Sequence, residues 1–564
     1  MLDIIVAILL FLLKWTIYLI IFDIFILRVC ISAYHYYFYK YKQNMPFISP
    51  VIPGYSTLVY LIQKIRSDHL NTHGPMHALV RQEFPNESDV PPLVGLMSLY
   101  KPIIFINSPE YLEDFYVKQA KYVDKEDMLR IQLFSLLGNS SIMMSSTEAQ
   151  ARKRKTISSA FYKDKLYKMV EQMKEVVAEK IEEMQHKFIN DKEGQLVGFD
   201  LLEQLNQIHI RVILNTAFGE DLKNQTLPYV LNGAVTQKGL GQYLRDIFMY
   251  IIFKSARYEL MIIPALTFLF YKKSDREYLK NAKVARDFCR QLIQERRKNL
   301  DQHKERADLL TILLLDEEYS KNEEEIIDEC ITFFLAGSQT VIAANANLIQ
   351  YATMNPEIQN KLLQEFRHVI LPDLNQEQLL NIDIRKEFNY DKIQDLNYFM
   401  MCFNESMRIE PPVSFSSMLL LTQDTTLNFP STNKQTQARW TFNIKKGDNI
   451  IINIPQIHHD PNQWIDHDKY IPERFDHQSK YYLKPNGQKR HSLAFTPFLG
   501  GRRICIGKTF AEIVAKIVVP ALMCKFKFEF VDKERYQNKL PLNVDMVVQP
   551  KIMMRIKPQD FQNL

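Results

Sequence analysis

Cys505 lies in a short glycine-rich loop, directly before an apolar segment over residues 508–523. Gly501 and Gly507 flank it, and glycines there let the backbone turn sharply and approach a flat ring. The apolar segment predicts a helix, whose N-terminal N–H groups favour a thiolate over a thiol. Arg503 can hold a carboxylate in a forked hydrogen bond. The loop therefore predicts a thiolate metal ligand; the alternative is a buried cysteine in a turn before a core helix.

The loop as a whole follows the pattern F-x-x-G-x-R-x-C-x-G, from Phe498 to Gly507. This pattern resembles the haem-binding loop of the cytochrome P-450 family. The resemblance implies that Cys505 ligates the iron of haem b (iron protoporphyrin IX), and that Phe498, Gly501, Arg503 and Gly507 bind the cofactor. A thiolate ligand donates electron density that favours O–O cleavage. We therefore expect a haem-thiolate monooxygenase.

Two more segments resemble the same family. Glu405-Ser406-Met407-Arg408 matches its E-x-x-R motif, and Pro472-Glu473-Arg474-Phe475 matches its P-E-R-F segment. Residues three apart share one helix face, so Glu405 and Arg408 can pair. Alone, such a pair is usually a solvated ion pair. The resemblance implies instead that Glu405, Arg408 and Arg474 form a buried structural triad that supports the haem-binding core and is not catalytic.

Another motif lies in the middle of a long helix expected over residues 322–354. Ala336-Gly337-Ser338-Gln339-Thr340 resembles the family's A-G-x-acid-T segment. A glycine in mid-helix costs about 1 kcal/mol relative to alanine, which suggests that something approaches the backbone closely. The resemblance implies that Ala336 and Gly337 form an oxygen groove and that Thr340 donates a hydrogen bond to bound oxygen. Without the resemblance, helix packing through small residues explains the glycine as well.

Gln339 stands where the family usually has Asp or Glu. An amide can orient water, but it cannot relay a proton by ionising. Proton delivery is then expected to be slower or to use another route. The substitution keeps a second hypothesis open, namely a haem-thiolate isomerase, dehydratase or peroxide-using enzyme that needs no reductase. Thr340 favours oxygenation.

Residues 149–161 resemble the family's helix under the haem edge, which usually carries W-x-x-x-R. Arg154 matches the arginine and is expected to bind a haem propionate, whereas Gln150 replaces the tryptophan. Many family members have another arginine soon after a double proline. Here no Arg or Lys occurs between Pro411 and Thr425. One propionate contact is therefore missing or comes from elsewhere in the chain.

The remaining pattern predicts a fold that is mainly α with smaller β-sheets, and the resemblance implies the cytochrome P-450 fold. Apolar residues at helical spacing predict helices over 166–186, 280–297, 322–354, 398–409 and 508–523. Strands are expected over 449–454 and over 546–556, the latter interrupted by Pro550. Two polar segments, 373–390 and 429–437, are predicted to be surface insertions.

The N-terminus is strongly apolar over residues 4–32, long enough for a helix that crosses a bilayer. We expect a membrane anchor over 1–33, a proline-containing linker over 34–54 and one catalytic domain over 55–564. Lys40 and Lys42 favour the cytoplasmic side for that domain. The alternative to the anchor is a buried N-terminal helix. The endoplasmic reticulum membrane is the expected location. The net charge is only +5, without a long basic run, so nucleic acid is not an expected partner.

The chain has no G-x-G-x-x-G fingerprint between a strand and a helix, so electrons are expected from an NADPH-dependent flavoprotein reductase. Basic residues are expected to steer that acidic partner: Arg152, Lys153, Arg154, Lys155, Lys489, Arg490 and Lys508. A merely solvated charge run is the alternative. The substrate is expected to be lipophilic, such as a fatty acid, sterol or terpenoid, because apolar residues fall in the segments that should line the pocket: Phe333, Leu335, Phe415 and Met418.

Overall fold

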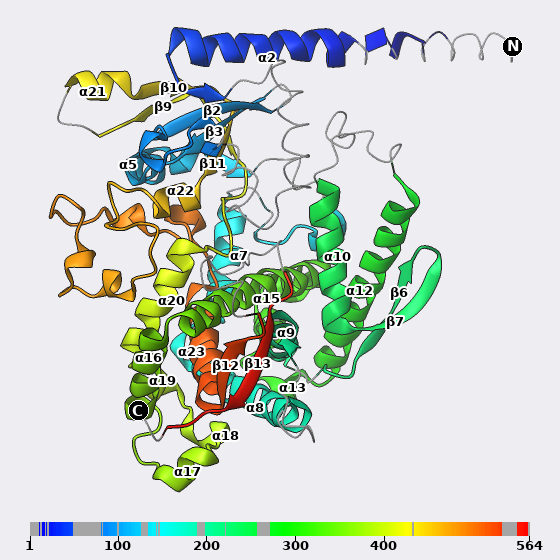
Figure 1. Cartoon of the computed structure of the whole chain (residues 1–564). Coiled ribbons are helices and arrows are strands. Elements are labelled where there is room, and N and C mark those ends of the chain that lie inside the picture. Colours follow the sequence, from blue (N-terminus) through cyan, green and yellow to red (C-terminus); the bar gives the residue numbers. More distant parts are fainter. Residues whose placement is uncertain are drawn as a thin grey trace, which may run out of the picture.

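The computed structural model describes most of residues 11–48, 80–98, 101–125, 133–188, 198–219, 222–255, 271–430, 434–532 and 550–561. Within these ranges the protein is mostly helical with small sheets, which confirms the predicted fold class (Figure 1). The helices are α2 (Arg28–Tyr36), α5 (Pro109–Asp114), α7 (Glu148–Ser159), α8 (Lys163–Phe188), α9 (Leu201–Phe218), α10 (Leu240–Ser255), α12 (Lys273–Lys298), α13 (Leu300–His303), α14 (Leu309–Leu315), α15 (Glu323–Met354), α16 (Pro356–Val369), α17 (Gln376–Leu380), α18 (Ile384–Glu387), α19 (Tyr390–Gln394), α20 (Asn397–Ile409), α21 (Lys434–Arg439), α22 (Ile454–His458) and α23 (Lys508–Lys525).

The largest sheet has the strand order β1-β2-β3-β11-β8-β4. Its centre pairs β3 with β11 in parallel, and its edge pairs β4 with β8 antiparallel, with Lys125 opposite Leu419. A second sheet has the order β12-β13-β5, and two hairpins, β6–β7 and β9–β10, complete the set. The strands are β1 (Phe47–Ile48), β2 (Leu93–Ser98), β3 (Lys101–Ile106), β4 (Val123–Lys125), β5 (Phe199–Asp200), β6 (Thr226–Leu231), β7 (Ala234–Gly239), β8 (Leu419–Leu421), β9 (Thr425–Asn428), β10 (Thr441–Ile444), β11 (Asn449–Ile452), β12 (Phe526–Phe530) and β13 (Met553–Pro558).

Helix α15 crosses the middle of the molecule and packs against α9, α20 and α23 (Figure 1). The Asn322 side chain caps its start by accepting a hydrogen bond from the Glu325 N–H at 3.4 Å. Pro356 follows its end and begins α16. In the described part of the chain, α15 is the one helix long and apolar enough to cross a membrane, yet it is mostly buried inside the protein. It is therefore the core helix.

The segment over residues 373–390 is not the surface insertion that we predicted. It forms α17, α18 and the start of α19, and four of its side chains, each at most 4% exposed, join the main core: Leu379, Ile382, Ile384 and Phe388. The polar composition of the segment hid these apolar residues. The second predicted insertion, 429–437, contains the start of α21, and its residues 431–433 lie outside the described part. Residues 533–549, which include the start of the last predicted strand, also lie outside it.

The N-terminal helix continues further along the chain than expected. It passes the predicted anchor boundary at residue 33 and ends at Lys42, so the start of the predicted linker is helical. Tyr39 is fully buried, its hydroxyl donates a hydrogen bond to Asp448, and its ring stacks on Phe47. This part of the helix is therefore docked on the sheet-rich part of the body (Figure 1). Residues 1–10 and 49–79 lie outside the described part, so the membrane span and the rest of the linker stay predictions.

Candidate active site

The cysteine loop is held by a backbone hydrogen bond within the loop and packs against the ring of Tyr116. The Cys505 N–H donates a hydrogen bond to the Phe498 carbonyl oxygen at 2.9 Å. Gly501 has a φ of +61°, in the region that favours glycine. A Cβ on Gly500 would lie 2.7 Å from Cε2 of Tyr116. The glycines are thus required both by the turn and by the close approach of the Tyr116 ring.

The electrostatic surroundings of the Cys505 thiol act in both directions. The side chain is accessible to solvent, yet the protein atoms around it raise its pKa, because they displace water that would stabilise a thiolate. The Gly507 N–H and the Arg154 guanidinium lower that pKa, but less strongly. The backbone before α23 thus supplies the expected N–H donor to the sulfur, but its effect on the pKa of Cys505 is smaller than that of burial. Ligation to a metal ion would supply the remaining drive for loss of the proton.

Arg154, Arg503 and Lys125 come together beside the cysteine loop. Arg154, from α7, donates to the Ile504 carbonyl oxygen, and Arg503 donates to the Met144 carbonyl oxygen at 2.9 Å. Burial lowers the pKa of each arginine, and the Arg154 charge further lowers the pKa of Arg503. Three positive side chains from three segments therefore share one region.

Lys125 is the member of this group that the sequence did not reveal. It ends β4, and its Nζ donates to Oγ of Ser417 at 2.8 Å. Burial, together with the nearby positive charges of Arg503 and Arg154, lowers the pKa of Lys125 to about 8, although Asp124 acts in the opposite direction. Ser417 lies in the stretch between Pro411 and Thr425 where no cation was found. Strand β4 thus brings a cation to the place where the sequence appeared to lack one.

The α15 motif presents one open edge of an otherwise buried helix. Ala336 is exposed and Thr340 is partly exposed, and the Thr340 hydroxyl donates to the Ala336 carbonyl oxygen at 2.8 Å. Gln339, in contrast, is only 1% exposed and points into the protein. A Cβ on Gly337 would lie 2.7 Å from Cδ1 of Ile213 in α9. Close packing against α9 thus accounts for this glycine, and Ala336 and Thr340 are left to form the open edge.

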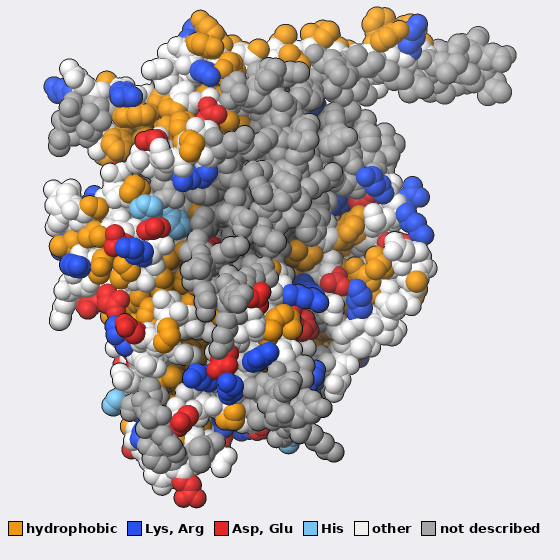
Figure 2. Space-filling model, viewed as in Figure 1, with side chains coloured by type: hydrophobic (Ala, Val, Ile, Leu, Met, Phe, Trp, Pro, Cys, Tyr) orange, Lys and Arg blue, Asp and Glu red, His pale blue; other side chains and the backbone are white. Residues whose placement is uncertain are grey.

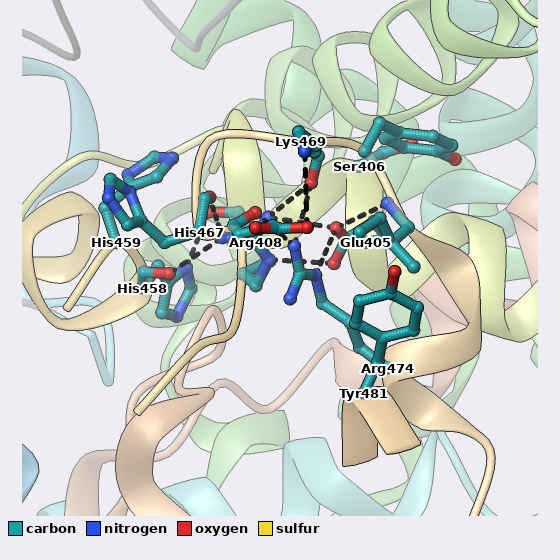
Figure 3. Close-up of polar contacts among 12 residues, drawn as sticks. Glu405, Ser406, Arg408, His458, His459, His467, Lys469, Arg474 and Tyr481 are labelled. Carbon is teal, nitrogen blue, oxygen red and sulfur yellow. Dashed lines mark hydrogen bonds and ion pairs between the residues drawn. The ribbon is translucent and has the colours of Figure 1, made fainter. Parts of the chain in front are cut away.

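Glu405, Arg408 and Arg474 lie together in the interior, and none of the three is exposed (Figure 3). Glu405 accepts hydrogen bonds from Arg408 Nε at 2.8 Å and Nη2 at 2.9 Å, and from Arg474 Nε at 2.9 Å. The Ile471 N–H donates to the same carboxylate at 2.9 Å. The remaining N–H groups of the two arginines donate to backbone carbonyl oxygens of residues 458–469. The triad therefore holds residues 458–469 in place, a segment with little regular secondary structure of its own.

His458 connects the triad to the segment before the cysteine loop. Its Nδ1 bonds to the Arg408 carbonyl oxygen at 3.2 Å, and its Nε2 accepts from the Thr496 N–H at 2.9 Å. This pattern requires a neutral ring with its proton on Nδ1. The ring also stacks on Phe495, with centroids 5.4 Å apart. His458 thus connects the triad to Thr496, which lies only nine positions before Cys505.

Comparison with known proteins identifies the family behind this geometry. A model of the cytochrome P450 family matches residues 69–557. The chain belongs to the cytochrome P450 family. An ultra-long-chain fatty acid omega-hydroxylase of Homo sapiens is 25% identical over 78% of this chain and 76% of its own length. Cytochrome P450 4F3 of Homo sapiens is 26% identical, over 75% and 76%. Cytochrome P450 4F6 of Rattus norvegicus is 32% identical over 48% of each chain.

This P450 is therefore a monooxygenase, and its cofactor is haem b. The residues present fit that group. Haem carries two carboxylates, and Lys125, Arg154 and Arg503 form a partly buried group of cations. Anions bound there would raise their lowered pKa values. Cys505 offers an accessible sulfur within the same region, because Arg154 acts on both the thiol and Arg503.

Part of the expected substrate lining belongs to the core. Phe333 packs with Phe161 and Phe510, with ring centroids 5.7 Å away in each case, and Leu335 is only 2% exposed. Phe415 and Met418 are partly buried beside a separate cluster on the sheet, together with Phe84 and Val90. Phe333, Phe415 and Met418 are each partly exposed, so of the four residues only Leu335 is closed off in the core. We also expect residues 128–137 and 545–548 to line the pocket, and of these 128–132 and 545–548 lie outside the described part.

Proposed function

We propose that this P450 inserts one oxygen atom from O2 into a lipophilic substrate, with a long-chain fatty acid as the first candidate and electrons from an NADPH-dependent flavoprotein reductase. Two observations carry the proposal: the accessible Cys505 beside Arg154, which lies with Arg503 and Lys125, and the open edge that α15 presents at Ala336 and Thr340. The fatty-acid class is supported by the omega-hydroxylase named among the relatives. Haem b, when bound through a thiolate, supplies the power to split the O–O bond.

The residues of this chain would bind the haem, set its orientation and deliver protons to the bound oxygen. Cys505 would hold the iron, and Lys125, Arg154 and Arg503 would hold the two propionates and so fix the rotation of the ring. The Thr340 hydroxyl, which donates to the Ala336 carbonyl oxygen, can turn to donate to oxygen bound at the open edge. Gln339 is buried and cannot ionise, so protons would reach the edge through water.

The surface proposed for the reductase is smaller than the sequence suggested. Lys153 is buried and pairs with Glu325 at 2.5 Å, and Arg154 points at the cysteine loop. Arg490 stacks on Trp464 at 4.0 Å and donates to two backbone carbonyl oxygens, so it too is structural. The exposed cations that remain candidates for docking are Lys155, Lys489, Arg502 and Lys508, together with Arg152, which is exposed but pairs with Glu318 at 3.3 Å. Docking through exposed charges weakens with salt, which makes the ionic-strength dependence of reduction a direct measurement.

We further propose attachment to the endoplasmic reticulum membrane through the apolar N-terminus, with the catalytic domain on the cytoplasmic side. The described part of the N-terminal helix supports attachment, because Phe11, Trp15, Tyr18, Leu19 and Phe22 are each at least 50% exposed. Exposed aromatic residues of this kind are typical of membrane interfaces. A lipophilic substrate would reach the enzyme from the same bilayer.

The first experiment is the carbon-monoxide difference spectrum of the reduced enzyme. The wild type should give the red-shifted band of a thiolate-ligated haem, and Cys505→Ala should abolish it. Cys30→Ala is the matched control, because Cys30 is also an exposed cysteine but lies on the N-terminal helix. Haem bound by the wild type without the red-shifted band would overturn the proposed ligation.

A second experiment separates the monooxygenase from an isomerase or dehydratase. Fatty acids of increasing chain length are incubated with the enzyme, reductase and NADPH under isotopically labelled O2. One labelled oxygen atom should enter the product, at or near the terminal carbon, and only when reductase and NADPH are present. Product formed without either of them would favour the reductase-independent chemistry. Labelled product from another lipid class would keep the monooxygenase and replace the substrate.

A further inference from the structure

The outer face of the docked N-terminal helix is apolar on both sides of residue 33, where the predicted anchor ends. Large side chains are exposed by 39–65% along it, at steps of three or four residues except for one step of five between Val29 and Tyr34: Phe22, Ile26, Val29, Tyr34, Tyr37 and Tyr41. Figure 2 shows apolar side chains along the upper rim of the molecule, where Figure 1 labels α2. A soluble protein rarely leaves such a continuous stripe in water.

The charges on this helix are arranged for an anionic surface. The one acidic residue from position 22 to position 42, Asp23, is paired with Arg28 at 2.8 Å. The basic residues at the end of the helix are Lys40, which lies over the Tyr36 ring at 5.3 Å, and Lys42, which is exposed. Three exposed tyrosines next to lysines are the composition found where protein meets lipid headgroups. A helix that merely connected two domains in water would carry charges of both signs on this face.

The opposite face is fixed to the body, so the stripe cannot turn inward. Tyr39 is fully buried against Asp448, whose carboxylate also accepts from the Lys445 N–H at 2.9 Å. One turn further, the Gln43 side chain makes two hydrogen bonds with the backbone of Asn443, at 2.8 Å and 2.6 Å. These contacts set the rotation of the helix about its own axis. The exposed stripe therefore has a defined direction, away from the sheet-rich part.

We infer that the outer face of residues 22–41 lies in the headgroup region of an anionic bilayer, with the helix close to parallel to the membrane plane. This inference rests on the proposed membrane attachment and sharpens it. Interfacial helices bury their apolar face by about 5–10 Å. The sheet-rich part of the catalytic domain would then be held directly against the membrane.

The test places a tryptophan on the stripe and measures its contact with lipid. Tyr37→Trp is compared with Tyr162→Trp, both in a Trp15→Phe background. Tyr162 is an equivalent control because it is 56% exposed, against 53% for Tyr37, but lies on the body between α7 and α8. The full-length holoenzyme is reconstituted in vesicles of phosphatidylcholine and phosphatidylserine, with or without bromine on the upper acyl chain. The emission of the background protein is subtracted.

Brominated lipid should reduce the added emission of Tyr37→Trp by at least about twofold and leave that of Tyr162→Trp unchanged. Acrylamide, a quencher in the water, should do the reverse. If Trp15 of the wild type is quenched by bromine but Tyr37→Trp responds only to acrylamide, attachment stands and the interfacial stripe is refuted. If neither position responds to bromine, attachment fails as well. Protection of Tyr37→Trp from both quenchers would point to a protein covering the stripe and would overturn the inference.

Discussion

Glu405→Gln tests whether the buried carboxylate is needed for its charge as well as for its hydrogen bonds. Glu405 accepts four hydrogen bonds, three of them on Oε1 from Arg408, Arg474 and the Ile471 N–H. A glutamine can keep those three, but its amide nitrogen would face Nε of Arg408, which now donates to Oε2 at 2.8 Å. Two fully buried guanidinium groups would lose their anion. Removing one partner of a buried ion pair costs about 3–5 kcal/mol.

This cost corresponds to a loss of between about a hundred- and several-thousand-fold in the ratio of folded to unfolded protein. Denaturant unfolding of the holoenzyme, followed by circular dichroism and haem absorbance, measures it. Glu473→Gln is the matched control, because Glu473 makes an ion pair with Lys361 at 2.8 Å in which both side chains are at least one-third exposed. A surface pair contributes only about 0–1 kcal/mol. Equal losses for the two variants would refute the assignment of the triad as the support of the core.

Three further outcomes are expected. Lys125→Met should speed haem transfer to a haem acceptor several-fold, whereas Lys121→Met, on an exposed lysine nearby, should not; equal rates would remove Lys125 from the propionate group. Burial raises the pKa of Asp448 to about 7, above its unfolded value, so its contribution is complete at low pH and is lost as the pH rises through 7. The protein should lose about 1 kcal/mol of stability between pH 6 and pH 8, and Asp448→Asn should flatten this part of the stability profile; an unchanged profile would contradict the cause. Gly337→Ala should cost about 1–3 kcal/mol through its contact with Ile213, and adding Ile213→Val, which removes that methyl group, should restore most of it in a double-mutant cycle.

Local patterns were sufficient for the regular elements. The long helix α15 was predicted to within a residue at each end, because a cap, three glutamates and a proline mark its limits. The pairing of Glu405 with Arg408 followed from their spacing of three residues on one helix. The short helices within 373–390 were missed, because few apolar residues are needed to bury so short an element and polar neighbours obscured them.

Contacts between distant segments could not be read from spacing. Lys125 and Ser417 are 292 residues apart and meet only because β4 pairs with β8. The motif around Gly337 indicated that something approaches the backbone, but not that Ile213 does so. The charge pattern at Arg152–Lys155 also misled, because a helix in contact with protein on one side directs Lys153 and Arg154 inward.

The parallel pairing of β3 with β11 has a consequence for how the chain folds while the ribosome synthesises it. The two strands are joined at their ends by a hydrogen bond between Asn107 and Asn453, which lie 346 residues apart. At about 5–20 residues per second, β3 waits roughly 20 to 70 seconds for its partner. During that time one edge of an apolar strand is open to wrong partners. A nascent chain that stops before β11 is synthesised keeps that edge open permanently, so premature termination between β3 and residue 449 should yield aggregates and not a smaller enzyme.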